Sequence, residues 1–314
     1  MKKLLLLLMA LLLTGCAANP LAGSVTSLAS DASAPQPGAP DSLATECAVT
    51  LWFRYLDEPM LAPETRLLTL SPDQPMEYTL VTALLSGPDV QSTELTGLFP
   101  AGTRVLSTLR QGRTLFVTLS KEIMNGYPDE PANWQGDPYW AAEMLLRRRL
   151  CMQSLAATVT ENCDVDTVQV LIEQQGETTD SLRLRQRYYL DTEDEKLLAD
   201  PLARDDALLL SPGTAMDTIL TLWQRQDWSR LRRYVAAEDT DTLIDRLDSL
   251  PRLMDFTLSG PTLSGRTATF TVTATVRGAA DATGLENRVL RLTQVGGLWL
   301  ITPEQLTGWL EGTP

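Results

Sequence analysis

Four cysteines and the absence of histidine define the chemistry open to this 314-residue chain. The cysteines are Cys16, Cys47, Cys151 and Cys163, and no two of them have the CxxC spacing typical of metal sites. Without histidine the chain has no Ser-His-Asp or Cys-His catalysis, no histidine-ligated zinc and no imidazole switch near neutral pH. Acid–base chemistry would have to come from carboxylates, lysine or tyrosine.

Cys16 closes a segment with the layout of a secretory signal. Two lysines precede ten apolar residues at 4–13, and the run ends in LTGC at 13–16. As a helix the apolar run covers about 15 Å, against about 30 Å for a hydrocarbon core, so it predicts a cleaved signal at 1–15 and not a membrane span. LTGC resembles the lipobox of bacterial lipoproteins, in which the cysteine is acylated; an ordinary signal with a chance cysteine is the alternative. We expect lipid attachment at Cys16, which anchors the protein at the extracytoplasmic face of the cell membrane.

The other three cysteines leave a disulfide open. With Cys16 lipidated outside the cytoplasm, Cys47, Cys151 and Cys163 can form one bridge and leave one free thiol. The sequence does not select among the three pairings. Cys151 lies in a predicted core helix, where a thiol commonly packs as an apolar group.

Charge and missing motifs narrow the function further. The chain carries 26 basic and 40 acidic residues, a net charge of −14, so phosphate backbones repel it and we expect no nucleic-acid partner. It contains no GxSxG, SxxK, GxGxxG or P-loop motif. Asp191, Glu193 and Glu195 alternate like calcium ligands, but Lys196 stands where an EF-hand has glycine, which favours a solvated charge run. We expect no catalysis, no metal and no cofactor.

Composition divides the mature chain into four segments. Residues 16–45 are rich in Ala, Ser, Pro and Gly without a periodic apolar face, and they predict a flexible tether. The length suggests two domains, at 46–177 and 211–314, with 178–210 as their connection.

The first domain has the pattern of an α+β fold. Strands are predicted at 49–55, 104–109, 114–119 and 167–173, and helices at 77–85 and 139–160. The order of elements is therefore β-α-β-β-α-β.

Several pieces of this domain resemble the GerMN domain, which is named for sporulation and spore germination. They are VTLWFRY at 49–55, ETRLL at 64–68, ALLSGP at 83–88, LFPAGTRVLS at 98–107, GRTLFVTLS at 112–120 and SLAATVTENCDVDTVQVLIEQQGE at 154–177. The resemblance implies a place in the envelope of a spore-forming bacterium and a role in protein assembly, spore formation or germination. Related modules build rings, so it also implies envelope proteins or copies of this chain as partners.

An aromatic-rich insertion interrupts the domain at 125–140. Tyr127, Trp134, Tyr139 and Trp140 lie there among prolines and acidic residues. Exposed aromatic side chains often anchor protein interfaces, which makes this loop a candidate partner contact. In the alternative, the rings fold back onto their own domain. Solvent exposure of the rings decides between the two.

The second domain begins with helices and continues with strands. Helices are predicted at 215–235, in two pieces, and at 240–250; strands follow at 255–258, 266–277, 288–294 and 298–301, and a last helix starts at 303. WQRQDWSRLRRYV at 223–235 and VLRLTQVGGLWLI at 289–301 resemble the nuclear-transport-factor-2-like α+β cone of bacterial lipoproteins. Such cones often enclose a pocket. This implies an alternative function, a lipoprotein that binds a small molecule or a peptidoglycan fragment in the cone.

Overall fold

The first half of the protein is built on a hairpin. In the computed structural model, which describes residues 45–173, 181–236, 247–278 and 281–311, β1 (Thr45–Tyr55) pairs antiparallel with β2 (Leu61–Leu70), and β3 (Leu95–Thr96) pairs with the end of β1. The sequence predicts β1 but not β2, whose Pro63 cannot donate to a sheet ladder. Pro63 is tolerated because β2 is an edge strand. The order of elements therefore begins β-β-α, where β-α is predicted.

A second sheet has the strand order β4-β5-β6-β7. These strands are β4 (Val105–Gln111), β5 (Thr114–Leu119), β6 (Thr167–Glu173) and β7 (Ser181–Arg183), and β8 (Leu202–Ala203) also pairs with β6. β4 and β5 form the predicted hairpin, while β5 and β6 pair in parallel across a helical crossover. β7 and β8 come from residues 178–210, so part of the predicted connection extends this sheet.

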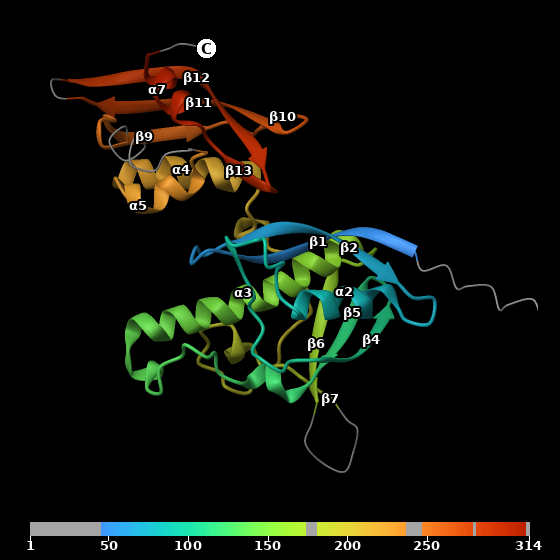
Figure 1. Ribbon diagram of the computed structural model, residues 1–314. Helices are drawn as coiled ribbons and strands as arrows, with labels where there is room; N and C mark the ends of the chain where they lie inside the picture. Colours follow the sequence, from blue (N-terminus) through green and yellow to red (C-terminus); the bar gives the residue numbers. More distant parts are fainter. Residues whose placement is uncertain (1–44, 174–180, 237–246, 279–280, 312–314) are drawn as a thin grey trace, which may run out of the picture. The chain divides into compact units, whose positions relative to one another are not determined.

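Two helices accompany these sheets, α2 (Met76–Leu85) and α3 (Pro138–Asn162). α3 starts with Pro138 directly after Asp137, whose carboxylate accepts the backbone N–H groups of Tyr139 and Trp140. This is a favourable helix start, because the cap satisfies N–H groups that have no partner within the helix. Figure 1 shows α3, in green, running along β1.

Side chains of α3 bind the backbone of β1 directly. The Ser154 hydroxyl donates to the carbonyl oxygen of Trp52 at 2.6 Å, and Thr158 accepts the Trp52 N–H at 3.1 Å. One turn further, the Asn162 amide bonds both the N–H and the carbonyl of Thr50, at 2.9 and 2.7 Å. The backbone N–H and C=O groups of β1 that face α3 therefore bond to side chains of this helix. In a wider sheet they would bond to a neighbouring strand.

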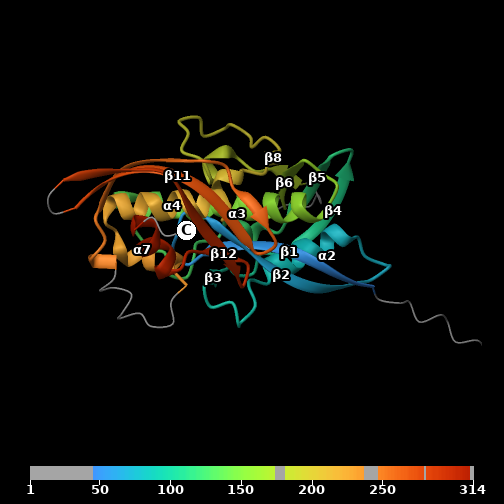
Figure 2. The same ribbon diagram turned by 90° about the horizontal axis from the view of Figure 1, so that it is seen from above.

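The second half contains helices and one antiparallel sheet. Its helices are α4 (Pro212–Arg225), α5 (Trp228–Leu231) and α7 (Pro303–Glu311), and its strands are β9 (Arg252–Leu258), β10 (Thr262–Ser264), β11 (Thr267–Arg277), β12 (Ala282–Val295) and β13 (Leu298–Leu300). The sheet order is β10-β11-β12-β13, with β9 paired to β11. α4 packs against β9 and α7 against β12, and Figure 2 shows β11 and β12 as the long strands of the sheet.

Large apolar side chains fill the core of this half. Trp223, Tyr234 and Phe270 are buried, and the Trp223 ring lies 5.6 Å from that of Trp309 on α7. The tip of the β1–β2 hairpin also contributes to this core, because Tyr55 and Met60 belong to the same cluster of buried residues. The hairpin of the predicted first domain therefore contributes side chains to the core of the predicted second domain.

Arginines and carboxylates surround the hairpin tip. Glu58 is fully buried and accepts hydrogen bonds from Arg230, whose Nε lies 3.0 Å from a Glu58 oxygen, and from Arg233 Nη1 at 2.6 Å. Arg54 forms an ion pair with Glu143 on α3 and donates to the Glu58 carbonyl oxygen at 3.0 Å. Each of these arginines therefore has a carboxylate partner in its own chain.

Some predictions concern residues outside those described. The signal at 1–15, Cys16, nearly all of the tether and most of the helix predicted at 240–250 fall there. Within the described ranges, no helix combines the length and the hydropathy needed to cross a membrane.

Candidate functional site

Part of the aromatic insertion folds back onto its own half. The Tyr127 hydroxyl donates to the carbonyl oxygen of Leu98 at 2.9 Å, and its backbone N–H donates to Glu130 at 3.0 Å. The guanidinium of Arg147 lies 5.6 Å from the centre of the Tyr127 ring. Burial raises the pKa of the Tyr127 hydroxyl well above its usual 10.0. Tyr127 therefore holds the insertion in place and is not a free contact residue.

The other end of the insertion presents an exposed ring. Tyr139 is 70% exposed, and its ring meets that of Trp140 edge-on at 5.7 Å. Trp140 is half-buried. Of the four aromatic residues predicted as partner contacts, Tyr139 is thus the one with a mostly exposed side chain.

Trp134, the fourth of these residues, helps to enclose an arginine. The Arg148 guanidinium lies 5.4 Å from the centre of the Trp134 ring and 5.2 Å from that of Tyr188. Tyr188 is itself fixed, because its hydroxyl donates to the Ile123 carbonyl oxygen at 2.8 Å. The negative faces of the two rings favour a cation, so they hold the side chain of Arg148 in place.

This arginine lies in a groove that we call the arginine groove. The arginine groove is a cavity of about 730 Å³ lined by Arg148, Arg183, Arg185, Arg187, Trp134 and Tyr188, among others. A neighbouring cavity of about 510 Å³ shares Trp134, Arg148 and Arg187 with it. Both volumes fall in the range of cavities that hold ligands. Four arginines in one groove are unusual for a chain with a net charge of −14.

The arginines of the groove differ in how far the chain satisfies them. Arg187 pairs with Glu195 at 2.8 Å, and Arg183 donates to backbone and side-chain oxygens at 199–200. Arg148 and Arg185 form no ion pair with another described residue. The Nε atoms of Arg148 and Arg183 are buried without a hydrogen-bond partner among the described residues. The groove therefore holds cationic donors that lack acceptors.

The sequence does not predict this groove, because residues 178–210 have the composition of a connection between domains. The stretch RLRQRYYL at 183–190 supplies three of the four arginines and Tyr188. Its alternation of arginine with apolar residues is the signal that points to a strand edge with a charged face. Arg148 lies in α3 as the middle one of three successive arginines at 147–149. The sequence alone does not distinguish it from its two neighbours.

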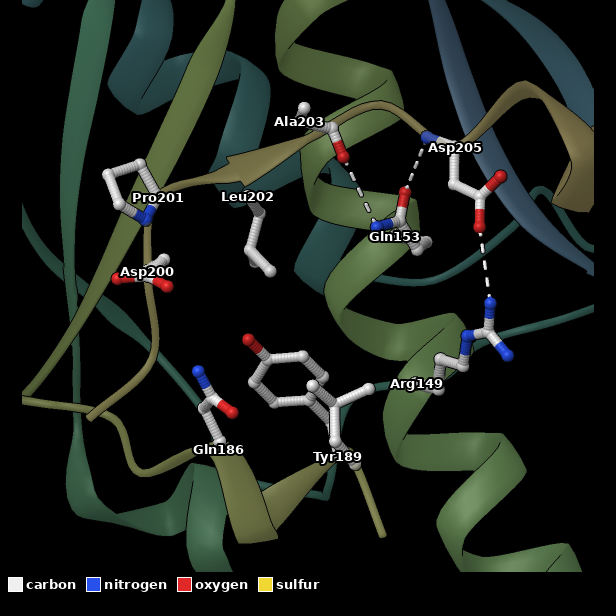
Figure 3. A pocket seen from close by; sticks show the side chains of 10 residues that line it. Arg149, Gln153, Gln186, Tyr189, Asp200, Pro201, Leu202, Ala203 and Asp205 are labelled. Atoms are coloured by element: carbon white, nitrogen blue, oxygen red, sulfur yellow. Dashed lines mark hydrogen bonds and ion pairs between the residues drawn. The ribbon is translucent and has the colours of Figure 1, made fainter. Parts of the chain in front are cut away.

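A third cavity, of about 290 Å³, lies beside β8 and is shown in Figure 3. Gln153 donates to the Ala203 carbonyl oxygen at 3.2 Å and accepts the Asp205 N–H at 2.9 Å, while Arg149 pairs with Asp205 at 3.2 Å. The Tyr189 ring points into this cavity (Figure 3). Burial and the nearby Asp200 raise the pKa of Tyr189. Because Arg149 and Gln153 are already bonded within the chain, this cavity offers less to a ligand than the arginine groove.

The described cysteines are free thiols. Cys151 is buried in α3, and Cys47 on β1 and Cys163 at the end of α3 are half-buried. Burial raises the pKa of Cys151 strongly and that of Cys163 to about 11, which keeps both thiols protonated and weakly nucleophilic at neutral pH. No disulfide joins the three in this structure, and no group of three metal-ligating side chains occurs in the described part of the chain.

Comparisons with known proteins give a match for the first half. Residues 55–178 match a family model described as sporulation and spore germination. This confirms the expected type of domain, although the match covers less than half of the chain. A comparison with curated proteins gave no significant match.

Solved structures of similar chains include three with low identity. The tandem GerMN domains of the sporulation protein GerM from Bacillus subtilis share 13% identity over 54% of this chain and 48% of that chain, with a TM-score of 0.33. The first GerMN domain of the same protein shares 16% over 51% and 96%, with a TM-score of 0.27. A candidate lipoprotein from Clostridium perfringens shares 18% over 53% and 93%, with a TM-score of 0.28. The chain spans about half the length of the tandem GerM structure.

Proposed function

We propose that this protein is a non-catalytic, lipid-anchored envelope protein that acts in spore formation or germination by binding other envelope proteins. The observation that carries the proposal is the match of residues 55–178 to the sporulation and spore germination family. That range contains β2, α2, β4, β5, α3 and β6, so it covers most of the first half.

Anchoring through Cys16 is supported by the sequence. LTGC at 13–16 follows an apolar run too short to span a bilayer, and an acyl chain contributes about 0.8 kcal/mol for each buried methylene. The second half, with its helices followed by an antiparallel sheet, is proposed to be a nuclear-transport-factor-2-like domain.

Binding is favoured over catalysis by the chemistry of the described side chains. Burial of Cys151 and partial burial of Cys163 raise the pKa values of their thiols, which disfavours the thiolate that a cysteine enzyme needs. The core of the second half is packed with large buried side chains, among them Trp223, Phe270 and Trp309. Tyr139, by contrast, presents an exposed ring of the kind that anchors interfaces.

The proposal is tested by replacing the gene with a Cys16→Ser allele in the bacterium that carries it. We expect the protein to leave the membrane fraction and the yield of heat-resistant, germinating spores to fall, as in a deletion strain. A Cys47→Ser allele is the matched control and should retain both properties. Normal spore yield and germination in the deletion strain would contradict the function, and membrane attachment of the Cys16→Ser protein would contradict the anchor.

A further inference from the structure

We propose that the arginine groove binds an acidic peptide segment of a partner protein, in which an apolar side chain lies two positions from a carboxylate. This deepens the proposed function, on which it rests for the nature of the partner. The groove itself is defined by residues of β7, α3 and the stretch that follows β7, and none of the predicted contact residues except Trp134 lines it.

The unsatisfied arginine is the first argument. The Arg148 guanidinium lies 5.4 Å from the centre of the Trp134 ring and 5.2 Å from that of the Tyr188 ring, and ring contacts of this kind leave its N–H groups unbonded. Its Nε is buried without an acceptor in the described part of the chain. A buried donor without an acceptor costs free energy, and a carboxylate that enters the groove removes that cost through a charge-assisted hydrogen bond.

The balance of charge selects a carboxylate over a phosphate group. Glu130 and Glu173 line the groove together with the four arginines, so the lining carries a formal charge of +2. One Glu130 oxygen already accepts the Tyr127 N–H. A phosphate would place up to two negative charges on one group beside these two carboxylates, whereas each carboxylate of a peptide places one. The strongly negative chain as a whole also repels long polyanions.

Apolar lining and a strand edge favour a peptide over a small acid. Met124, Ile172 and Leu182 lie in the same groove, and Leu182 is 56% exposed. Leu182 belongs to β7, which pairs with β6 on one side and ends the strand order on the other. An extended peptide can bond to such an edge through its backbone and place alternate side chains into the groove. An apolar residue would then contact Leu182 while a carboxylate two positions away in the peptide, on the same face, reaches Arg148.

The test uses the full chain with Cys16→Ser, purified from solution, and isothermal titration calorimetry. The probe is the hexapeptide AELFDA, acetylated at its N-terminus and amidated at its C-terminus, and the comparison peptide is AQLFNA with the same blocked ends. We expect saturable binding of the acidic peptide and at least about tenfold weaker binding of the comparison peptide, as loss of a charge-assisted hydrogen bond predicts. Equal binding of the two peptides, or binding of neither, would overturn the proposal.

Variants locate the site. Arg148→Gln should weaken binding of the acidic peptide by about tenfold or more. The matched control is Arg113→Gln, because Arg113 lies outside the groove and its guanidinium already pairs with Asp164 and Asp166. Arg113→Gln should leave affinity within about twofold of the parent. If Arg148→Gln does not fold, as judged by circular dichroism, Arg185→Gln takes its place, because Arg185 is exposed and lines the groove.

A competition experiment distinguishes a site for peptide carboxylates from a site for phosphate. Inorganic phosphate added at the peptide concentration should leave peptide binding unchanged. If phosphate displaced the peptide on equal terms, the groove would be a phosphate site and the proposal would be wrong. The measurement uses protein in solution, so it is independent of membrane attachment and of spore yield. If the peptide does not bind, the proposed role in spore formation or germination is not affected. If the deletion strain forms and germinates spores normally, the peptide-binding result is not affected.

Discussion

Arginine has opposite surroundings at the hairpin tip and in the arginine groove. At the tip, Arg230 and Arg233 both bind the buried carboxylate of Glu58. In the groove, Arg148 lies close to two aromatic rings and pairs with no carboxylate of the described chain. A guanidinium with an acceptor in its own chain stabilises the fold, whereas one that lacks an acceptor retains its capacity to bind a ligand. Glu58→Ala, Glu143→Gln and Arg148→Gln test that distinction, and Tyr127→Phe gives the effect expected of one neutral hydrogen bond for comparison.

The largest effect is expected from Glu58→Ala. Removing this buried carboxylate leaves Arg230 without its ion-pair partner and Arg233 with Asp57 alone, so the free energy of unfolding should fall by about 3 kcal/mol in chemical denaturation. Asp57→Ala is the matched control: Asp57 also pairs with Arg233 but is 73% exposed, and its loss should cost less than about 1 kcal/mol. Equal effects of the two substitutions would remove the distinction between buried and exposed pairs.

Glu143 should give a smaller, pH-dependent effect. Burial alone would raise the pKa of Glu143, but its ion pairs with Arg54 and Arg147 bring the pKa below the usual 4.5. A carboxyl whose pKa is lowered by folding stabilises the protein above its unfolded pKa, and this contribution is lost as the pH falls through the folded value. Glu143→Gln should therefore cost about 2 kcal/mol at pH 7. The difference from the parent should narrow below pH 4.5, and a constant difference would contradict the assignment.

Tyr127→Phe should have an intermediate effect on stability. The substitution removes the hydrogen bond from the hydroxyl to the Leu98 carbonyl oxygen, which contributes about 1 kcal/mol to the free energy of unfolding. Tyr139→Phe is the control, because Tyr139 is 70% exposed and should leave stability unchanged. Both are measured by chemical denaturation. A larger loss from Tyr139→Phe would mean that the exposed ring is structural.

The smallest effect on stability is expected for Arg148→Gln. The change loses contact with the rings of Trp134 and Tyr188, but it also removes a buried N–H that has no acceptor among the described residues. These effects oppose each other, so the free energy of unfolding should change by less than about 1 kcal/mol. A loss as large as that of Glu58→Ala would show that Arg148 stabilises the fold in the same way as the arginines at the hairpin tip.

Periodicity in the sequence is sufficient to predict the positions of the longer helices and strands. β6 has its predicted bounds of 167–173, and α3 extends the predicted helix by one residue at the start and two at the end. β2 was missed because Pro63 argues against a strand until its place at a sheet edge is known. β7 and β8 are three and two residues long, which is too short for a period to be visible.

The arginine groove could not be predicted from the sequence for a different reason. Arg148 and Tyr188 are 40 positions apart in the chain, and their contact depends on how α3 and the stretch after β7 pack. The aromatic residues of the loop at 125–140 differ in exposure: Tyr127 is half-buried and bonded to Leu98, whereas Tyr139 is mostly exposed. Burial of a single ring is a property of tertiary packing, which local pattern does not contain.

The side chains of α3 that bind β1 also restrict how two copies of this protein can meet. An open strand edge accepts a strand from another chain, which leads to uncontrolled association. Ser154, Thr158 and Asn162 occupy the backbone groups of Thr50 and Trp52, so a neighbouring molecule finds no free donors or acceptors there. The helix thereby closes this stretch of β1 to growth of the sheet from one molecule to the next.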